Sequence, residues 1–273
     1  MREIKNTKEI QELTLHIFEQ FNTFCVEKGI NFFLAYGTLI GAIRHNGFIP
    51  WDDDIDIWML REDFERLVTE FPSWGKTHGL YINSPETVNR TYNRIHAQIC
   101  SNNTKAVATN RIDNYEEGCF IDIFPIDGSP NDAVRRWIRL THLQIIKNLG
   151  TISAVKPDAK NKSIKHRAIS WAAAVLRCLN LSRIMGKYKN LALRSSYLES
   201  EYLQLPIAGR KGRNLLLPRD YFLPSVKKSF ENMDVAVPKE YDKVLKDIYG
   251  DYMVLPPEDK RVSFHECQFF ISE

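Results

Sequence analysis

The sequence lacks the features that mark several classes of protein. Its five cysteines are scattered and include no Cys-x-x-Cys pair, which argues against a disulfide framework and for reduced thiols in the cytosol. No apolar run approaches the roughly 20 residues that span a bilayer, and residues 1–11 are too polar for a secretory signal. No internal repeat or low-complexity tract occurs. We therefore expect neither a disulfide-stapled, a membrane-spanning nor a repeat protein.

The composition is that of a packed protein. Of the 273 residues, 44% are hydrophobic and 11% aromatic, enough for a substantial core and too many for a disordered chain. This length allows one large domain, or a domain with an additional lobe.

Positive charge is concentrated in one part of the chain. Residues 133–196 contain fourteen lysines or arginines and one acid, a local balance of +13, so the remainder carries −10 of the total of +3. Such a region is typical of proteins that meet an anionic membrane, polyphosphate, glycan or nucleic acid. It lacks the interleaved aromatic and basic residues or the reading helix of nucleic-acid modules, so we expect no nucleic-acid partner.

The most informative stretch is acidic. Four aspartates fall within five positions, residues 52–56, and apolar residues frame them. We predict a strand here, on which Asp54 and Asp56 point to one face with backbones roughly 6.5–7 Å apart. Crowded carboxylates repel one another unless a cation or solvent offsets them, so the pair indicates a divalent-cation site.

Hydrophobic periodicity predicts alternating helices and strands. Strands are expected over 31–36, through Asp54 and Asp56, over 92–99 with His96 pointing outward, and over 120–124. Helices are expected over 7–28, 39–46, 61–71 (stopped by Pro72), from about 134, and over 163–180, 182–204 and 238–249. Turns are expected at 37–38 and 125–130. The fold class predicted is α/β (α+β).

Three separate pieces assemble into a candidate site. Gly37 and Thr38, between a strand and a helix, leave backbone N–H groups for a phosphate. Asp54 and Asp56 can hold one or two Mg²⁺ ions, with Mn²⁺ as an alternative. Asp122, on a later strand, can complete the metal site or accept the proton of an attacking hydroxyl. Phosphoryl transfer needs little more than these parts.

Simpler interpretations exist for each piece. An EF-hand loop would use Asp52, Asp54 and Asp56, but Ile57 stands where that loop needs glycine and Asp63 where it needs glutamate. Taken singly, the Asp-x-Asp pair, the Gly-Thr turn and Asp122 are weak signals. Their occurrence together, in this order, favours a metal-dependent transferase acting on phosphates.

The run AYGTLIGAIRHNGFIPWDDDIDI at 35–57 closely resembles the signature of the LicD family, as do FIDIFPIDG at 120–128 and the segment from IYGDYM at 248–253 to Arg261 and His265. That family comprises phosphocholine transferases of bacterial surface glycans, with fukutin-type ribitol-phosphate transferases as distant relatives. The resemblance is specific at residues 34–60 and weak in the basic middle.

The resemblance implies a nucleotidyltransferase-like fold, a small mixed sheet flanked by helices with an appended basic helical region. Gly37 and Thr38 match the turn that contacts donor phosphate. The metal ligands match Asp54, Asp56 and Asp122. The donor implied is CDP-choline, and the acceptor a sugar hydroxyl of a lipid-linked or surface glycan such as teichoic acid, lipopolysaccharide or capsule precursor. CMP would be released.

Further expectations concern the rest of the chain. Arg44, Arg261 and His265 are candidate donor-binding residues. We divide the chain into a catalytic core (1–130), a basic helical region facing a membrane or the acceptor (131–210), and a C-terminal segment that packs back on the core (211–273). A cytoplasmic protein, peripheral on the inner face of the plasma membrane and meeting its anionic surface, is expected.

Rival functions remain open. The transferred group could be ribitol phosphate or glycerol phosphate instead of phosphocholine. A nucleotidyltransferase using NTP fits the same motifs, and a transferase using a UDP-sugar is a more distant rival. A basic nucleic-acid-binding module would leave the acidic stretch unexplained.

Overall fold

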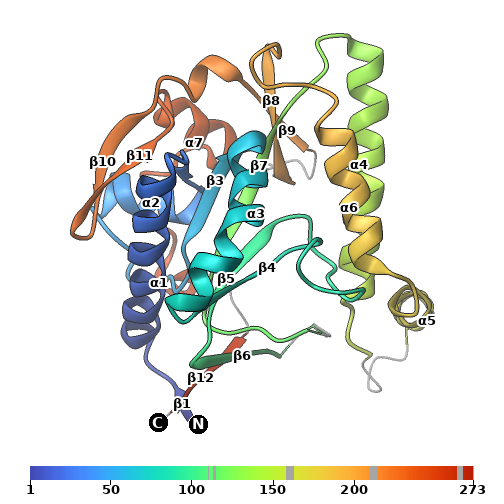
Figure 1. Ribbon diagram of the computed structural model, residues 1–273, viewed down its shortest axis with the longest axis horizontal. Helices are drawn as coiled ribbons and strands as arrows, with labels where there is room; N and C mark the ends of the chain where they lie inside the picture. The colour runs from blue at the N-terminus through green and yellow to red at the C-terminus, as the bar shows by residue number, and fades with distance from the viewer. Residues whose placement is uncertain (110, 113–114, 158–162, 209–213, 263–266, 273) are drawn as a thin grey trace.

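This computed structural model describes residues 1–109, 111–112, 115–157, 163–208, 214–262 and 267–272, which form a mixed α/β fold (Figure 1). The helices are α1 (Thr7–Lys28), α2 (Tyr36–Arg44), α3 (Arg61–Thr77), α4 (Ala133–Ser153), α5 (Ile164–Arg177), α6 (Leu181–Ala192) and α7 (Tyr241–Tyr249). The strands are β1 (Arg2–Ile4), β2 (Phe33–Leu34), β3 (Asp56–Leu60), β4 (Leu80–Asn83), β5 (Ala97–Ser101), β6 (Thr104–Ala108), β7 (Phe120–Gly128), β8 (Tyr202–Ala208), β9 (Asn214–Pro218), β10 (Val226–Phe230), β11 (Met233–Val237) and β12 (Cys267–Ile271). The predicted α/β class is confirmed.

The central sheet has the order β2-β3-β7-β5-β4, with the hairpin β8-β9 added beside the second half of β7. β3 and β7 run parallel, whereas β2 and β5 are antiparallel to their neighbours. α1 and α3 lie together on one face, where the rings of Phe24 and Phe71 meet edge to face at 5.1 Å. Ile121 and Ile123 of β7 are fully buried, and the alternation of a strand turns Asp122 to the opposite face.

Two smaller sheets complete the fold. β1, β12 and β6 form one of them, so the N- and C-terminal strands pair and the two ends of the chain lie side by side (Figure 1). β10 and β11 form a hairpin that packs on α2 and β2. The sequence did not predict these pairings.

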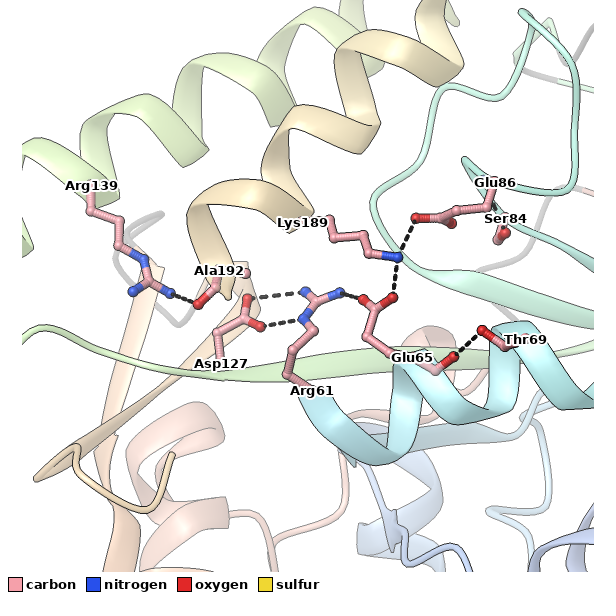
Figure 2. Close-up of polar contacts among 9 residues, drawn as sticks. All are labelled: Arg61, Glu65, Thr69, Ser84, Glu86, Asp127, Arg139, Lys189 and Ala192. Atoms are coloured by element: carbon pink, nitrogen blue, oxygen red, sulfur yellow. Dashed lines mark hydrogen bonds and ion pairs between the residues drawn. The ribbon is translucent and has the colours of Figure 1, made fainter. Parts of the chain in front are cut away.

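α4 and α6 pack against each other beside the sheet, and an ionic network with a buried centre at Arg61 and Asp127 ties α6 to α3 and β7 (Figure 2). Arg61 donates to both carboxylate oxygens of Asp127, at 2.7 and 3.2 Å, and pairs with Glu65 at 3.1 Å. Lys189 of α6 pairs with Glu65 and, at 3.5 Å, with Glu86. The first turns of α3 therefore connect α6 to the central sheet through ion pairs.

Helix limits were predicted well where local caps define them. The helix expected over 7–28 is confirmed as α1: the Asn6 side chain accepts a hydrogen bond from the N–H of Lys8, and Gly29 takes the left-handed conformation at φ +60°. The stop expected at Pro72 is wrong, because α3 continues through it to Thr77. Trp74, in the extra turn, packs on Phe24 and Phe71.

Several strand predictions need correction. The acidic strand begins only at Asp56, where pairing with β7 starts, so Asp54 precedes it. The turn expected at 125–130 is wrong, since β7 runs to Gly128. Pro125 is tolerated there because it lies between the residues of β7 that pair with β5 and those that pair with β8. Residues 92–96 precede β5 instead of forming its first half.

Two helix predictions also differ. α2 begins at Tyr36, so Gly37 and Thr38 lie in its first turn and not in a separate turn. The helix expected over 182–204 ends at Ala192, and β8 follows. Every helix in the described residues is too short or too polar to span a bilayer. The division of the chain at 130 and 210 stays a prediction.

Candidate functional site

A cluster of carboxylates occupies the entrance to β3. The side chains of Asp52, Asp53 and Asp54 place one carboxylate oxygen each within 4.8 Å of one another. Asp56, the first residue of β3, stands in register with Asp122 of β7 in the parallel pair, and the N–H of Asp122 donates to the carbonyl of Ile55 at 3.0 Å. The sheet therefore joins two acids that are 66 positions apart in the sequence.

The pKa of Asp56 reflects the crowding of these carboxylates. Burial raises the pKa of Asp56 well above its ordinary value, and the charges of Asp54, Asp122 and Asp52 raise it further. Neighbouring carboxylates favour the protonated form because each added negative charge repels the next. A bound divalent cation would reverse that balance, since it stabilises all of these carboxylates in the ionised form.

The first turn of α2 supports the cluster. The Thr38 hydroxyl accepts a hydrogen bond from the N–H of Asp56 at 2.8 Å, and a Cβ atom added to Gly37 would lie 2.8 Å from a carboxylate oxygen of Asp52. The residue before Gly37, Tyr36, has a strained φ of +42°. The positive end of the α2 dipole thus faces negative side chains, which is the favourable orientation.

The C-terminal part of the chain also reaches this region. Burial raises the pKa of Tyr249, the last residue of α7, and the charges of Asp56, Asp52 and Asp54 add to the effect. The guanidinium of Arg261 lies 5.7 Å from the ring centre of Trp51, next to the acidic run. The guanidinium of Arg44 donates to the carbonyl of Tyr252 at 2.6 Å. His265 lies outside the described residues.

A cavity of about 490 Å³ opens beside Asp122, between the sheet and α4. Its lining includes the basic side chains of Arg94, His96, Arg111 and Lys147. The Nε2 atom of His96 is 3.4 Å from the carboxylate of Asp122. This volume suits a small-molecule ligand, and the lining suits an anionic one.

Two of the cavity's arginines are held by one buried acid. Arg94 and Arg111 pair with Glu117 at 2.8 and 3.4 Å, and the Glu117 side chain is only 2% exposed. Lys147 of α4 donates to the carbonyl of Pro206 at 2.8 Å, and burial lowers the pKa of its ammonium. The carboxylates of Glu117 and Asp122 balance the two guanidiniums, so Lys147 gives this part of the cavity wall its net positive charge.

The structure thus brings together most of the predicted residues. Asp56 stands in register with Asp122, and the charges of Asp54 and Asp122 act on it, whereas the carboxylate oxygens within 4.8 Å of one another are those of Asp52, Asp53 and Asp54. Thr38 hydrogen-bonds to Asp56, and Gly37 lies against Asp52. Arg261 stacks on the residue before the cluster, whereas Arg44 fastens α2 to the C-terminal segment. The contacts of all these residues with a ligand stay predictions.

Other members of the site were missed from the sequence. Asp52 belongs to the cluster, although it was considered only as an EF-hand ligand, and its place in the acidic run was the available signal. Arg94 and His96 alternate along the approach to β5 and share a face. Lys147 carried no signal, because it is one lysine among many on α4.

Comparisons with known proteins match segments of the chain that include this site. The family model described as LicD/FKTN/FKRP, nucleotidyltransferase domain, matches residues 29–145. The chain is 30% identical over 269 residues to the lipopolysaccharide cholinephosphotransferase LicD of Haemophilus influenzae, covering 97% of each protein. It is 34% identical over 81 residues to an uncharacterized protein of Rickettsia typhi, covering 27% of this chain and 26% of that protein.

Proposed function

The chain belongs to the LicD family, and from that premise we propose that it transfers phosphocholine from CDP-choline to a sugar hydroxyl of a bacterial surface glycan. The observation that carries the proposal is the register of β3 and β7, which sets Asp56 opposite Asp122 beside Asp54. We infer that the mixed sheet is a nucleotidyltransferase-like core. Residues 131–210 would be its basic helical region and residues 211–273 the segment that returns to it.

The carboxylate set fits a magnesium site. Asp54, Asp56 and Asp122 would hold one or two Mg²⁺ ions, with Mn²⁺ as an alternative, because hard cations prefer carboxylate oxygens. The raised pKa of Asp56 supports this assignment, since the cluster lacks enough positive charge to keep it ionised. When bound, the metal supplies positive charge against the diphosphate of the donor.

The protein's own residues account for the remaining steps. Three cationic side chains would bind the phosphate oxygens of the donor. They are Arg94, Arg111 and Lys147, which line the cavity next to Asp122. The backbone N–H groups at Gly37 and Thr38 would add to that contact. Asp122 would accept the proton of the acceptor hydroxyl while His96 orients its carboxylate.

The reaction would be a single displacement at the phosphorus atom that bears choline. The acceptor oxygen forms a bond to the phosphorus that bears choline, and the bond from that phosphorus to the bridging oxygen of the diphosphate breaks. CMP leaves with that electron pair, and the hydroxyl proton passes to Asp122. Positioning and charge neutralisation therefore supply most of the catalysis.

The donor can be identified from the leaving product. Purified protein with Mg²⁺ is incubated with CDP-choline, CDP-ribitol, CDP-glycerol, CTP or a UDP-sugar, each with and without lipopolysaccharide or teichoic acid acceptors. We expect CMP from CDP-choline and phosphocholine on the glycan, both abolished by EDTA. CMP from CDP-ribitol or CDP-glycerol alone would identify another alcohol, whereas pyrophosphate from CTP would identify a nucleotidyltransferase.

Gly37 provides a test of the metal site that leaves its ligands in place. In Gly37→Ala the new Cβ would press on Asp52 at 2.8 Å, and the flexible carboxylate would move aside while the fold is kept. Displacing a supporting group of this kind typically weakens metal binding about 10- to 100-fold. We expect that loss in a Mg²⁺ titration followed by thermal unfolding.

The matched control for this change is Gly186→Ala in α6. No heavy atom lies within 4 Å of its added Cβ, so alanine should stabilise the helix by about 0.5–1 kcal/mol and leave the Mg²⁺ titration unchanged. Equal Mg²⁺ midpoints for the two variants would show that Asp52 and Gly37 do not shape the metal site.

We also propose that the protein lies on an anionic membrane surface at the cytoplasmic face. α5 supports this, because Ile164 and Trp171 are 84% and 72% exposed in a region with a balance of +13. The protein should sediment with anionic vesicles and be released by high salt, because screening weakens attraction between surface charges. Binding that ignores both lipid charge and salt would contradict this proposal.

A further inference from the structure

A groove runs along the packed helices α4 and α6, which lie side by side in Figure 1. It consists of two hollows of about 580 and 420 Å³ that share the lining residues His142, Leu191 and Arg194. The larger hollow lies at the start of α4 and is lined by Arg135 and Arg139 as well. We call the two hollows together the α4–α6 groove.

Arg139 is the unusual member of the groove. It is only 6% exposed, yet among the described residues its Nε and Nη1 atoms have no hydrogen-bond partner. Its Nη2 atom donates to the carbonyl of Ala192 at 3.1 Å, and Figure 2 shows the guanidinium on the far side of that carbonyl from the pair of Arg61 and Asp127. Buried donors without partners are costly, so Arg139, which lines the larger hollow, has capacity left to donate to an acceptor placed there.

The surroundings of Arg139 define the charge of that acceptor. Arg135 and Arg194 line the same hollow, and no ion pair among the described residues involves either of them. The one carboxylate in the lining, Asp132, accepts a hydrogen bond from the N–H of Arg135 at 2.8 Å and caps α4. Three guanidiniums around a helix N-terminus match a phosphate group, which they can bind in pairs of hydrogen bonds.

Isoleucines line the groove as well, next to polar side chains such as Lys187 and Asn190. Ile145 and Ile146 line the smaller hollow, and Ile138 lines the larger one. Ile138 and Ile145 are 43% and 51% exposed, and Trp137 on the same helix is 68% exposed. Exposed apolar residues grouped next to a cationic pocket suit a ligand with a charged head and a hydrocarbon chain.

We propose that the α4–α6 groove binds the phosphate of an anionic membrane lipid. Arg139, Arg135 and Arg194 hold the phosphate, and the first part of the lipid chain lies over Ile138 and Ile145. This inference deepens the membrane association proposed above and rests on it. It does not depend on the identity of the donor, because none of these residues lines the cavity beside Asp122.

The test is binding of the full chain to phosphatidylcholine vesicles with and without phosphatidic acid, measured by flotation. The variant Arg135→Gln/Arg194→Gln changes two exposed side chains and keeps the core intact. Its control, Arg90→Gln/Arg183→Gln, removes the same charge from two exposed arginines that line a different hollow. We expect the groove variant to bind phosphatidic acid at least about tenfold more weakly and the control to bind within about twofold of the wild type.

A second variant and a second probe sharpen the result. Arg139→Met should also lose binding while remaining folded, because it removes a buried donor that lacks partners. Inorganic phosphate alone, followed by thermal unfolding, should stabilise the wild type far less than short-chain phosphatidic acid does. Equal stabilisation by the two probes would overturn the lipid assignment in favour of a free-phosphate site.

Failure of this inference is distinguishable from failure of the proposed function. Equal weakening in the groove variant and its control would show diffuse attraction and overturn the groove as a site. CMP release from CDP-choline with a soluble acceptor should be unchanged in the groove variant, since that reaction needs no membrane. Loss of vesicle binding together with normal CMP release is therefore the supporting result.

Discussion

Asp56→Asn is expected to lower phosphocholine transfer by roughly 100- to 1,000-fold, the usual effect of removing one group that stabilises transition-state charge. The same variant should make the metal-free protein more stable. Burial and the charges of Asp54, Asp122 and Asp52 raise the pKa of Asp56, so its ionised form opposes folding. Asparagine keeps the shape of the side chain and removes that charge. CMP release and the midpoint of thermal unfolding in EDTA measure the two effects.

The pH dependence has a definite sign. The folded pKa of Asp56 lies above its ordinary value of 3.8, so the folded protein binds this proton more tightly than the unfolded chain does. Stability contributed by the proton is present at low pH and is lost as the pH rises from about 3.8 through the raised pKa. The difference in stability between Asp56→Asn and the wild type should therefore grow over that window and level off above it.

The effect of Mg²⁺ on the midpoint of thermal unfolding tests whether Asp56 is a metal ligand. A ligand that binds only the folded state raises its stability, so Mg²⁺ should raise the unfolding midpoint of the wild type and leave that of Asp56→Asn almost unchanged. Asp234→Asn, an exposed aspartate on β11 outside the cluster, is the matched control and should respond to Mg²⁺ like the wild type. A normal Mg²⁺ response in Asp56→Asn would remove this residue from the metal site.

The sequence drew attention to this acidic stretch for a simple reason. Asp54 and Asp56 are close in the chain, and the apolar residues around them could only be part of a buried element. Asp122 was grouped with them as a carboxylate on a later strand and by the family resemblance, but the parallel pairing of β3 and β7 that sets it opposite Asp56 is a long-range contact that the sequence does not show. The cavity beside it was beyond reach for the same reason: Arg94 and Lys147 come from a loop and a helix that meet only in the folded protein.

In the fold as well, elements defined by nearby residues were predicted better than those that depend on distant contacts. α1 was predicted to the residue because the two residues that flank it, Asn6 and Gly29, are typical helix caps that the local sequence shows. β8 was missed because the basic helical pattern before it hides the alternation of Leu203 and Leu205, which are both buried in the hydrophobic core. Pro72 and Pro125 were given too much weight, since the pairing and packing around each of them remove the usual penalty.

The positive charges of the basic region have two different roles in the structure, whereas the sequence suggested a single one. Lys189 lies in the ionic network that fastens α6 to α3, so part of the positive charge serves the fold (Figure 2). Arg135 and Arg194 form no ion pair among the described residues and line the α4–α6 groove. Charge counting alone treats these residues alike, and only their partners separate them.

The second large effect is expected in this network. Asp127→Asn should destabilise the protein by about 3–5 kcal/mol, the usual cost of removing one partner from a buried ion pair. The side chains of Arg61 and Asp127 are 6% and 0% exposed. Burial by itself would lower the pKa of Arg61, but Asp127 outweighs it, and the pKa of Arg61 is raised above its ordinary value. Without the carboxylate, the buried guanidinium would keep its ion pair with Glu65 but lose its two hydrogen bonds to Asp127. Urea unfolding measures the change.

Two further variants separate the buried pair from the charges around it. Lys189→Gln removes an ion-pair partner that is 31% exposed, and it should cost less than about 1 kcal/mol because water screens such pairs. Arg61→Met/Asp127→Leu should recover most of the stability lost in Asp127→Asn, since an apolar pair needs no compensating charge. A cost for Asp127→Asn no greater than that for Lys189→Gln would mean that packing of α4 and α6, and not this ion pair, fastens the helical region to the sheet.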